Sequence, residues 1–212
     1  MKISNYLKVL ILFFVLIMIW SVIKPHDIFT WFLESFPALF GLIILIATYK
    51  KFRFTNFSYT LILIHCTILF VGGHYTYAGV PLFNWIRDLL DQSRNNYDKI
   101  GHLAQGMIPA LLAREIMIRT HVTSKMGWAG FLSVCIAMTI SALYELLEWM
   151  VAVLTGTSAD AFLGTQGYIW DTQSDMLFAL IGSVPGLIVF SAFQNKAIAK
   201  MNTEGRIQNS EG

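Results

Sequence analysis

Hydrophobic residues along the chain fall into six long runs that are separated by short polar segments. The runs cover residues 9–23, 31–49, 56–73, 100–118, 128–154 and 176–193. Because an α-helix needs about 20 mostly apolar residues to cross a bilayer, runs of this length are typical of membrane spans. The pattern predicts an all-α polytopic membrane protein with about six transmembrane helices in one bundle. It also predicts a single transmembrane domain over residues 1–193 and a flexible tail over residues 194–212.

A shorter apolar segment lies between the third and fourth runs. After Pro81, the apolar residues of segment 82–90 cluster at helical spacing and include Trp85. Tryptophan is enriched where a membrane meets water, and a short amphipathic helix can lie in that plane. We therefore expect a short interfacial helix here.

The placement of charge predicts the orientation of the spans. Charged residues make up 13% of the 212 residues, about half their usual share in soluble domains. Cytoplasmic connections of membrane proteins are enriched in Lys and Arg. Because the basic residues collect in alternate connections, we expect both termini, and thus the tail, on the cytoplasmic side. The net charge of +2 is too small to indicate a nucleic-acid partner. The basic residues of the alternate connections, which we expect on the cytoplasmic side, are Lys2, Lys8, Lys50, Lys51, Arg53, Arg114, Arg119, Lys125, Lys196, Lys200 and Arg206.

Ionisable residues within or beside the runs gather at one level once this topology is applied. They come in pairs three or four residues apart, a spacing that places both side chains on one face of a helix. The fourth and sixth spans enter from outside and the fifth leaves there, so every pair lies in the outer third of the membrane. Polar side chains at this depth are costly and mark functional sites. The pairs are Asp98 with His102, Glu145 with Glu148, and Asp171 with Asp175.

A divalent metal ion is one ligand that suits this set. Imidazole together with carboxylates favours Zn²⁺, Mn²⁺ or Fe²⁺, and carboxylates alone favour Mg²⁺ or Ca²⁺. Facing helices of a bundle hold metal ions with such residues in other proteins. The metal ligands expected under this hypothesis are His102, Glu145, Asp171 and Asp175.

Other roles for the same residues remain open at this stage. Crowded carboxylates can act as an acid and a base without a metal, with Glu148 and Asp98 as the candidate catalytic residues. The groups can instead relay protons or ions across part of the membrane. In a purely structural role, they only hydrogen-bond one helix to another.

Three further polar residues have simpler interpretations. Arg114 and Glu115 are neighbours near the inner end of the fourth run, where we expect them to pair and to extend toward the interface. His65 lies alone in the third run and is expected to be a hydrogen-bonded packing residue.

Several stretches of the chain also resemble a family of bacterial inner-membrane proteins typified by YjdF. The resemblance covers roughly residues 74–190 and implies a multi-pass protein of the inner membrane, and no established activity comes with it. A fainter likeness to VanZ-like membrane proteins rests on Asp98, Lys99 and His102, with one more residue in the gap than in that pattern, and implies no function. The stretches that carry the first resemblance are 74–77 (HYTY), 94–102 (RNNYDKIGH), 112–115 (LARE), 144–149 (YELLEW), 162–167 (FLGTQG) and 170–176 (WDTQSDM).

The position of the polar residues favours one functional hypothesis. A site at the level of lipid headgroups suits a membrane-embedded enzyme, dependent on a divalent metal ion, that acts on a lipid or lipid-linked envelope substrate. A small ion- or proton-coupled transporter is the alternative, but it needs a polar path to the cytoplasmic side, where the sequence offers only His65, Arg114 and Glu115. A structural or accessory membrane protein is the third class.

Overall fold

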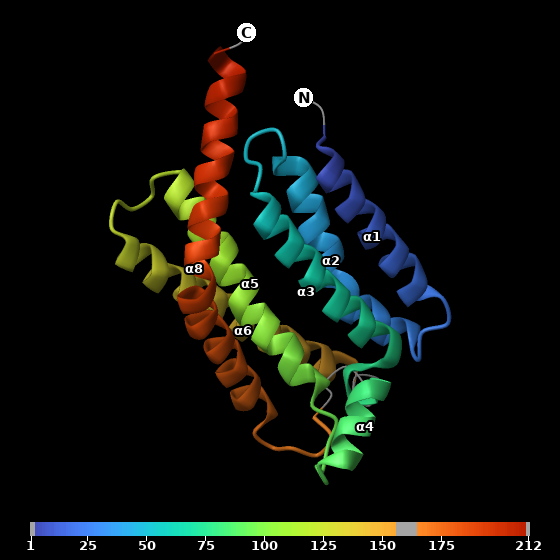
Figure 1. The fold of residues 1–212 in the computed structure, drawn as a ribbon. Coiled ribbons are helices and arrows are strands. Elements are labelled where there is room, and N and C mark those ends of the chain that lie inside the picture. The colour runs from blue at the N-terminus through green and yellow to red at the C-terminus, as the bar shows by residue number, and fades with distance from the viewer. Residues whose placement is uncertain (1–2, 156–164, 211–212) are drawn as a thin grey trace.

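Six long helices form the bundle in the computed structural model, which describes residues 3–155 and 165–210, with side chains up to residue 203 (Figure 1). All regular structure in these ranges is helical, which confirms the predicted all-α fold. The helices in chain order are α1 (Asn5–Val22), α2 (Ile28–Thr48), α3 (Asn56–Tyr75), the 3₁₀ turn η1 (Tyr77–Gly79), α4 (Pro81–Leu89), α5 (Tyr97–Arg119), α6 (Met126–Thr155) and α8 (Asp171–Ser210).

Polar residues directly before the apolar runs set where the first three helices begin. The side chains of Ser4, Asp27 and Thr55 each accept a hydrogen bond from a backbone N–H in the first turn. Such caps satisfy N–H groups that have no partner inside the helix. At Asp27, the bond from the Thr30 N–H is 2.7 Å long and holds the pKa of the carboxyl below its ordinary value.

The helix that corresponds to the fourth run is the most polar and lies in the middle of the bundle. Helices α1, α2, α3, α6 and α8 (to Thr203) are long and apolar enough to cross a membrane. With 23 residues α5 has the length, but buried polar side chains lower its mean hydropathy. It packs against α3, α6 and α8, which shield those side chains. The fourth predicted run is therefore the central helix α5, whereas the five other predicted runs form the helices that are apolar enough to cross a membrane.

Both ends of the described chain lie at one end of the bundle, as an even number of spans requires (Figure 1). The connection between α2 and α3 lies at this end as well. The predicted short amphipathic helix is α4, which lies at the opposite end together with residues 165–170. Residues 156–164, which include the first part of the stretch 162–167 that carries the family resemblance, lie outside the described residues.

The last helix extends beyond its hydrophobic run at both ends. It begins at Asp171, early enough for Asp171 and Asp175 to share one face, and it continues to Ser210. The sequence predicts a flexible tail from residue 194, but residues 194–210 are helical. Gln194 explains part of the difference, because it is fully buried and bonds the Leu111 carbonyl at 2.6 Å and Arg114 at 2.6 Å.

The expected pair between Arg114 and Glu115 is not formed. Arg114 donates to Gln194 and Asn195 of α8, whereas Glu115 accepts hydrogen bonds from Ser58, Thr55 and Arg119. Neighbouring residues on a helix point about 100° apart, so they do not face each other. The expectation was wrong for this geometric reason.

Helices α5 and α8 approach each other closely at two glycines. A Cβ at Gly106 would lie 1.8 Å from the Ala179 carbonyl oxygen, and one at Gly182 would lie 2.0 Å from the Leu103 carbonyl oxygen. Small residues allow such approach between membrane helices. The contact brings the first turns of α5 and α8, and their charged residues, within reach of each other.

Replacing Gly106 by Ala should destabilise the bundle. The new methyl group has no room against α8, and overpacking of this kind costs about 1–3 kcal/mol, sometimes more. Gly130→Ala on α6 is the matched control, since nothing lies within 4 Å of a Cβ there and alanine favours a helix over glycine by roughly 0.5–1 kcal/mol. Thermal unfolding of both variants in detergent tests this; equal melting temperatures would contradict the close contact.

Candidate functional site

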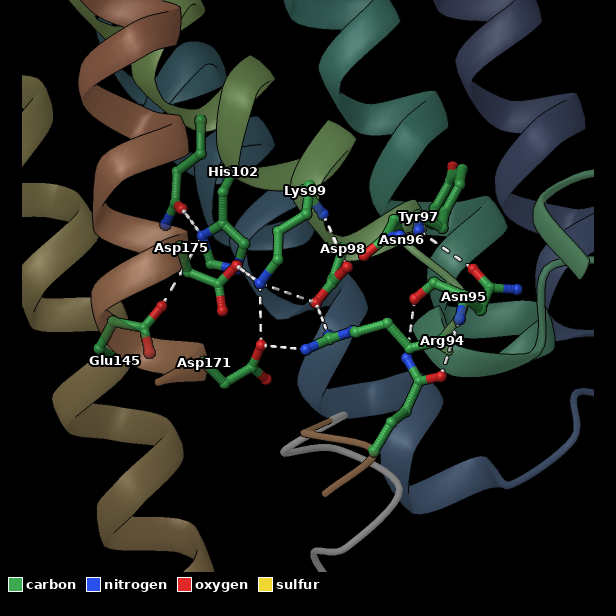
Figure 2. A network of polar contacts seen from close by, with 12 residues as sticks. Arg94, Asn95, Asn96, Tyr97, Asp98, Lys99, His102, Glu145, Asp171 and Asp175 are labelled. Atoms are coloured by element: carbon green, nitrogen blue, oxygen red, sulfur yellow. Dashed lines mark hydrogen bonds and ion pairs between the residues drawn. The ribbon is translucent and has the colours of Figure 1, made fainter. Parts of the chain in front are cut away.

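The ionisable residues predicted to share one level do come together, at the end of the bundle opposite the termini. Five of the six lie within one group of polar contacts from α5, α6 and α8 (Figure 2). Each is at most 7% exposed, so all five are removed from solvent. They are Asp98, His102, Glu145, Asp171 and Asp175.

Two basic side chains occupy the space between three of these carboxylates. Lys99 Nζ lies 2.8 Å from Asp171 Oδ1, 2.7 Å from Asp175 Oδ1 and 3.4 Å from Asp98 Oδ2. Arg94 donates to Asp98 and, at 2.5 Å, to Asp171 Oδ1. Ion pairs buried in this way are strong only when both charges keep their partners. The pairs therefore tie the first turn of α5 to the first turn of α8.

The turn before α5 holds Arg94 in place. Asn95 is fully buried and donates to the Val80 carbonyl at 3.0 Å and to Asn84 at 2.9 Å, while its own Oδ1 accepts from the Tyr97 N–H. The Gln166 side chain bonds both the N–H and the carbonyl of Asn95, at 2.9 and 2.8 Å. A buried backbone turn needs such partners, and this one fixes the direction in which Arg94 enters the site.

His102 and Glu145 lie beside the ion pairs and are less completely bonded. His102 Nδ1 lies 2.8 Å from Gln105 Oε1 and 3.7 Å from Glu145 Oε1, while Nε2 lies 3.6 Å from Asp175 Oδ1. Glu145 Oε1 has no hydrogen-bond partner among the described residues. One ligand atom each from His102, Glu145 and Asp175 lies within 4.8 Å of the others. These three residues could hold a metal ion.

Asp171, the fourth expected metal ligand, is engaged differently. It belongs to a second group of buried carboxylates with Asp98 and Asp175, but Lys99 and Arg94 already contact its Oδ1. The sequence did not indicate these contacts, since Arg94 and Lys99 look like ordinary interfacial cations until α5 and α8 are placed side by side.

A cavity of about 100 Å³ adjoins the metal-ligating candidates. His102, Asp175 and Glu148 line the cavity, and Glu148 does not belong to the ion pairs of the described residues. The cavity also reaches His65, which the sequence predicts to be a packing residue. Its other polar lining residues are Glu34, Tyr77, Asp98, Gln105 and Tyr144.

Sequence reasoning did not assign Glu34 to this site. It is the only charged residue of α2 and is 4% exposed. Its Oε2 lies 3.5 Å from the hydroxyl of Tyr144 on α6. A single acid in an apolar run was the available signal, but nothing in the run indicates that α2 faces α6.

Comparison with known proteins shows which family the chain belongs to. Residues 6–196 match the family described as "Predicted membrane protein (DUF2238)". The inner membrane protein YjdF of Escherichia coli (strain K12) is 45% identical over 185 residues, which cover 87% of this chain and 88% of that protein. The chain belongs to the DUF2238 family. It is thus a multi-pass protein of the inner membrane, and the family resemblance is confirmed. No solved structure matches it.

The stretches that carried the family resemblance supply most of the site in this DUF2238 chain. Segment 94–102 provides Arg94, Lys99 and His102, segment 144–149 provides the two acids of α6, and segment 170–176 provides those of α8. Gln166, from a further stretch, holds the turn before α5. Residues far apart in sequence therefore meet at one end of the bundle.

Replacing Lys99 by Met should destabilise the protein strongly. The change leaves Asp171 and Asp175 without the ammonium between them, and breaking a buried pair in this way costs about 3–5 kcal/mol. Lys125→Met is the control, because Lys125 is exposed on the α5–α6 connection. Unfolding of both variants in mixed micelles gives the difference in their free energies of unfolding. A double variant with Asp175→Asn should regain part of the loss, and a fully stable Lys99→Met would show that the pairs contribute little.

Proposed function

We propose that this protein is a membrane-embedded enzyme that uses a divalent metal ion, bound by His102, Glu145 and Asp175, to act on a lipid or lipid-linked envelope substrate. The observation that carries the proposal is the buried, unpartnered Oε1 of Glu145 beside an imidazole and a second carboxylate. A buried carboxylate oxygen without a partner is costly. A metal ion would supply the missing interaction.

The balance of buried charge supports a further cation. Among the described residues that line the cavity or belong to the ion-pair cluster, two are permanent cations, Arg94 and Lys99, and six carry carboxyl groups. Unpaired carboxylates in a membrane interior need a counter-charge or a proton. The carboxyl groups are those of Glu34, Asp98, Glu145, Glu148, Asp171 and Asp175.

The geometry favours the group with the histidine over the group of three aspartates. Among Asp98, Asp171 and Asp175 the ammonium of Lys99 already takes the position of a cation. Tetrahedral ligands about 2.1 Å from a zinc ion lie roughly 3.4 Å apart, and His102 Nε2 lies 3.6 Å from Asp175 Oδ1. Lys99 Nζ also contacts this oxygen, at 2.7 Å, so Asp175 would lie between the ammonium and the metal ion. A small shift of Glu145 would complete a three-residue set, with Asp171 holding Lys99 in place.

The surrounding residues have distinct roles under this proposal. Gln105 accepts from His102 Nδ1 and so leaves Nε2 free to bind a metal ion, as partners of ligating histidines commonly do. A bound divalent ion polarises an ester or phosphate oxygen and activates water. Glu148 lines the cavity without an ion pair among the described residues and is placed to take up a proton, whereas Asp98 orients Arg94 and Lys99.

The proposed orientation places this site at the outer side of the inner membrane. Both chain ends lie at the end of the bundle that carries the basic connections, and such connections stay cytoplasmic. The polar site lies at the other end, where the headgroups of the outer leaflet and of lipid-linked envelope precursors are found. This position supports a lipid substrate.

Metal analysis of the purified protein tests the site. The wild type, purified without chelators and supplied with divalent ions, should hold about one metal ion per chain, and His102→Ala and Glu145→Gln should lose it. Gln105→Leu should lower metal affinity about 10–100-fold, because the imidazole loses its orienting partner. Elemental analysis with a metal titration gives these values.

Two variants control for general effects of charge. Asp171→Asn should keep the metal, because Asp171 contacts Lys99 and Arg94 instead. Glu115→Gln should keep it as well, since Glu115 is a buried acid on the same helix but distant from the site. A wild-type protein that binds no divalent ion would refute the proposal, and loss of metal in Asp171→Asn would move the site to the three aspartates.

Reporter fusions test the orientation. Alkaline phosphatase, which is active only outside the cytoplasm, should be inactive when fused after residue 212 and active when fused after Gln92, beyond α4. Activity of the C-terminal fusion would place the polar site on the cytoplasmic side and remove the argument for an outer-leaflet substrate.

A further inference from the structure

Glu34 differs from the other buried acids in what surrounds it. It is the only charged residue of α2 and is 4% exposed. Among the described residues it accepts a hydrogen bond from the Tyr144 hydroxyl, which is long at 3.5 Å. The ion pairs of the described residues at this end involve Asp98, Asp171, Asp175 and Glu145, and none involves Glu34. Its carboxyl group faces the cavity instead.

The groups that face Glu34 across the cavity provide no fixed positive charge. From α6 come Tyr144 and Glu148, and from η1 comes Tyr77. Asp98 of α5 and Asp175 of α8 line the cavity as well, but Arg94 and Lys99 already pair with them. The imidazoles of His65 and His102 also line the cavity, but neither pairs with Glu34. Acids and phenols therefore predominate around it.

We propose that Glu34 is a proton-binding site of the cavity, occupied by a proton when the protein is at rest. A carboxylate removed from water, without a cation and beside other acids, is far less stable than the neutral acid. The neutral acid can donate a hydrogen bond to whatever polar group enters the cavity. This conclusion concerns Glu34 alone and does not require a bound metal ion.

The role of that proton in catalysis rests on the proposed function. When a lipid or lipid-linked substrate is cleaved, the oxygen of the leaving group needs a proton. Glu34 would give its proton to that oxygen as the bond to the oxygen breaks, and would become a carboxylate. The acceptor, water or another hydroxyl, loses one proton to Glu148 as its new bond forms, and transfer of that proton across the cavity restores the neutral Glu34 and the Glu148 carboxylate. Proton transfer by a positioned acid of this kind is common in enzymes.

Infrared difference spectroscopy tests the proton directly. A neutral carboxylic acid has a carbonyl-stretch band that a carboxylate lacks. The wild-type spectrum minus that of Glu34→Gln, in lipid nanodiscs at neutral pH, should show this band, and the band should weaken as the pH rises because the acid loses its proton. A difference spectrum with only carboxylate bands would overturn the proposal.

Chemical labelling of the wild type gives a second test that needs no variant. Dicyclohexylcarbodiimide reacts with neutral carboxylic acids in apolar surroundings, and peptide mass spectrometry locates the product. Glu34 should be labelled, and less so at higher pH. Glu115 is the internal control, since Arg119, Thr55 and Ser58 stabilise its charged form, and it should stay unlabelled. Labelling of Glu115 but not of Glu34 would contradict the proposal.

The outcomes separate this inference from the proposed function. Glu34→Gln should keep its metal, because Glu34 is not among the proposed ligands. A wild type without metal but with a neutral Glu34 would refute the metal-dependent enzyme and leave the proton site standing. A metal-containing protein whose Glu34 is charged would refute the proton site and leave the metal-dependent enzyme standing.

Discussion

The ion pairs of Lys99 are the interaction on which the polar end of the bundle depends. One ammonium lies among carboxylates of α5 and α8, within 2.8 Å of two of them, and these groups are almost completely excluded from water. Buried charges of this kind are stable only when oppositely charged groups lie beside them. The same pairs fix the rotation of α8 about its axis, and so determine that Asp175 also faces His102.

The close approach of α5 and α8 makes these pairs geometrically accessible. Gly106 and Gly182 let the two backbones touch about two turns along the helices from the charged residues. The ion pairs and this backbone contact therefore hold the same two helices together. On the other side, α6 meets α5 through small residues, of which Ala137 and Ser141 are fully buried. One further turn along that face, α6 delivers Glu145 to the site.

The sequence predicted the helices well and the partners of the polar residues less well. Long apolar runs gave the spans, and spacings of three or four residues correctly placed Asp98 with His102 and Asp171 with Asp175 on shared faces. Local patterns carry no information on which side chains meet across helices. For this reason the contacts of Arg94 and Glu34, and the separate partners of Arg114 and Glu115, became visible only in the structure.

The buried acids of this protein fall into three electrostatic situations, which implies different states for them. Asp98, Asp171 and Asp175 contact the permanent cations Arg94 or Lys99, and Glu115 accepts hydrogen bonds from hydroxyls, a backbone N–H and Arg119. Glu145 has an oxygen without a partner beside an imidazole, a gap suited to a metal ion. Glu34 lines the cavity without an ion pair in the described part of the chain, and a proton is the compensation that we propose for it. Buried acids without a compensating charge are costly in a network that only holds helices together, and this cost is the reason for proposing that the site binds a metal ion and a proton.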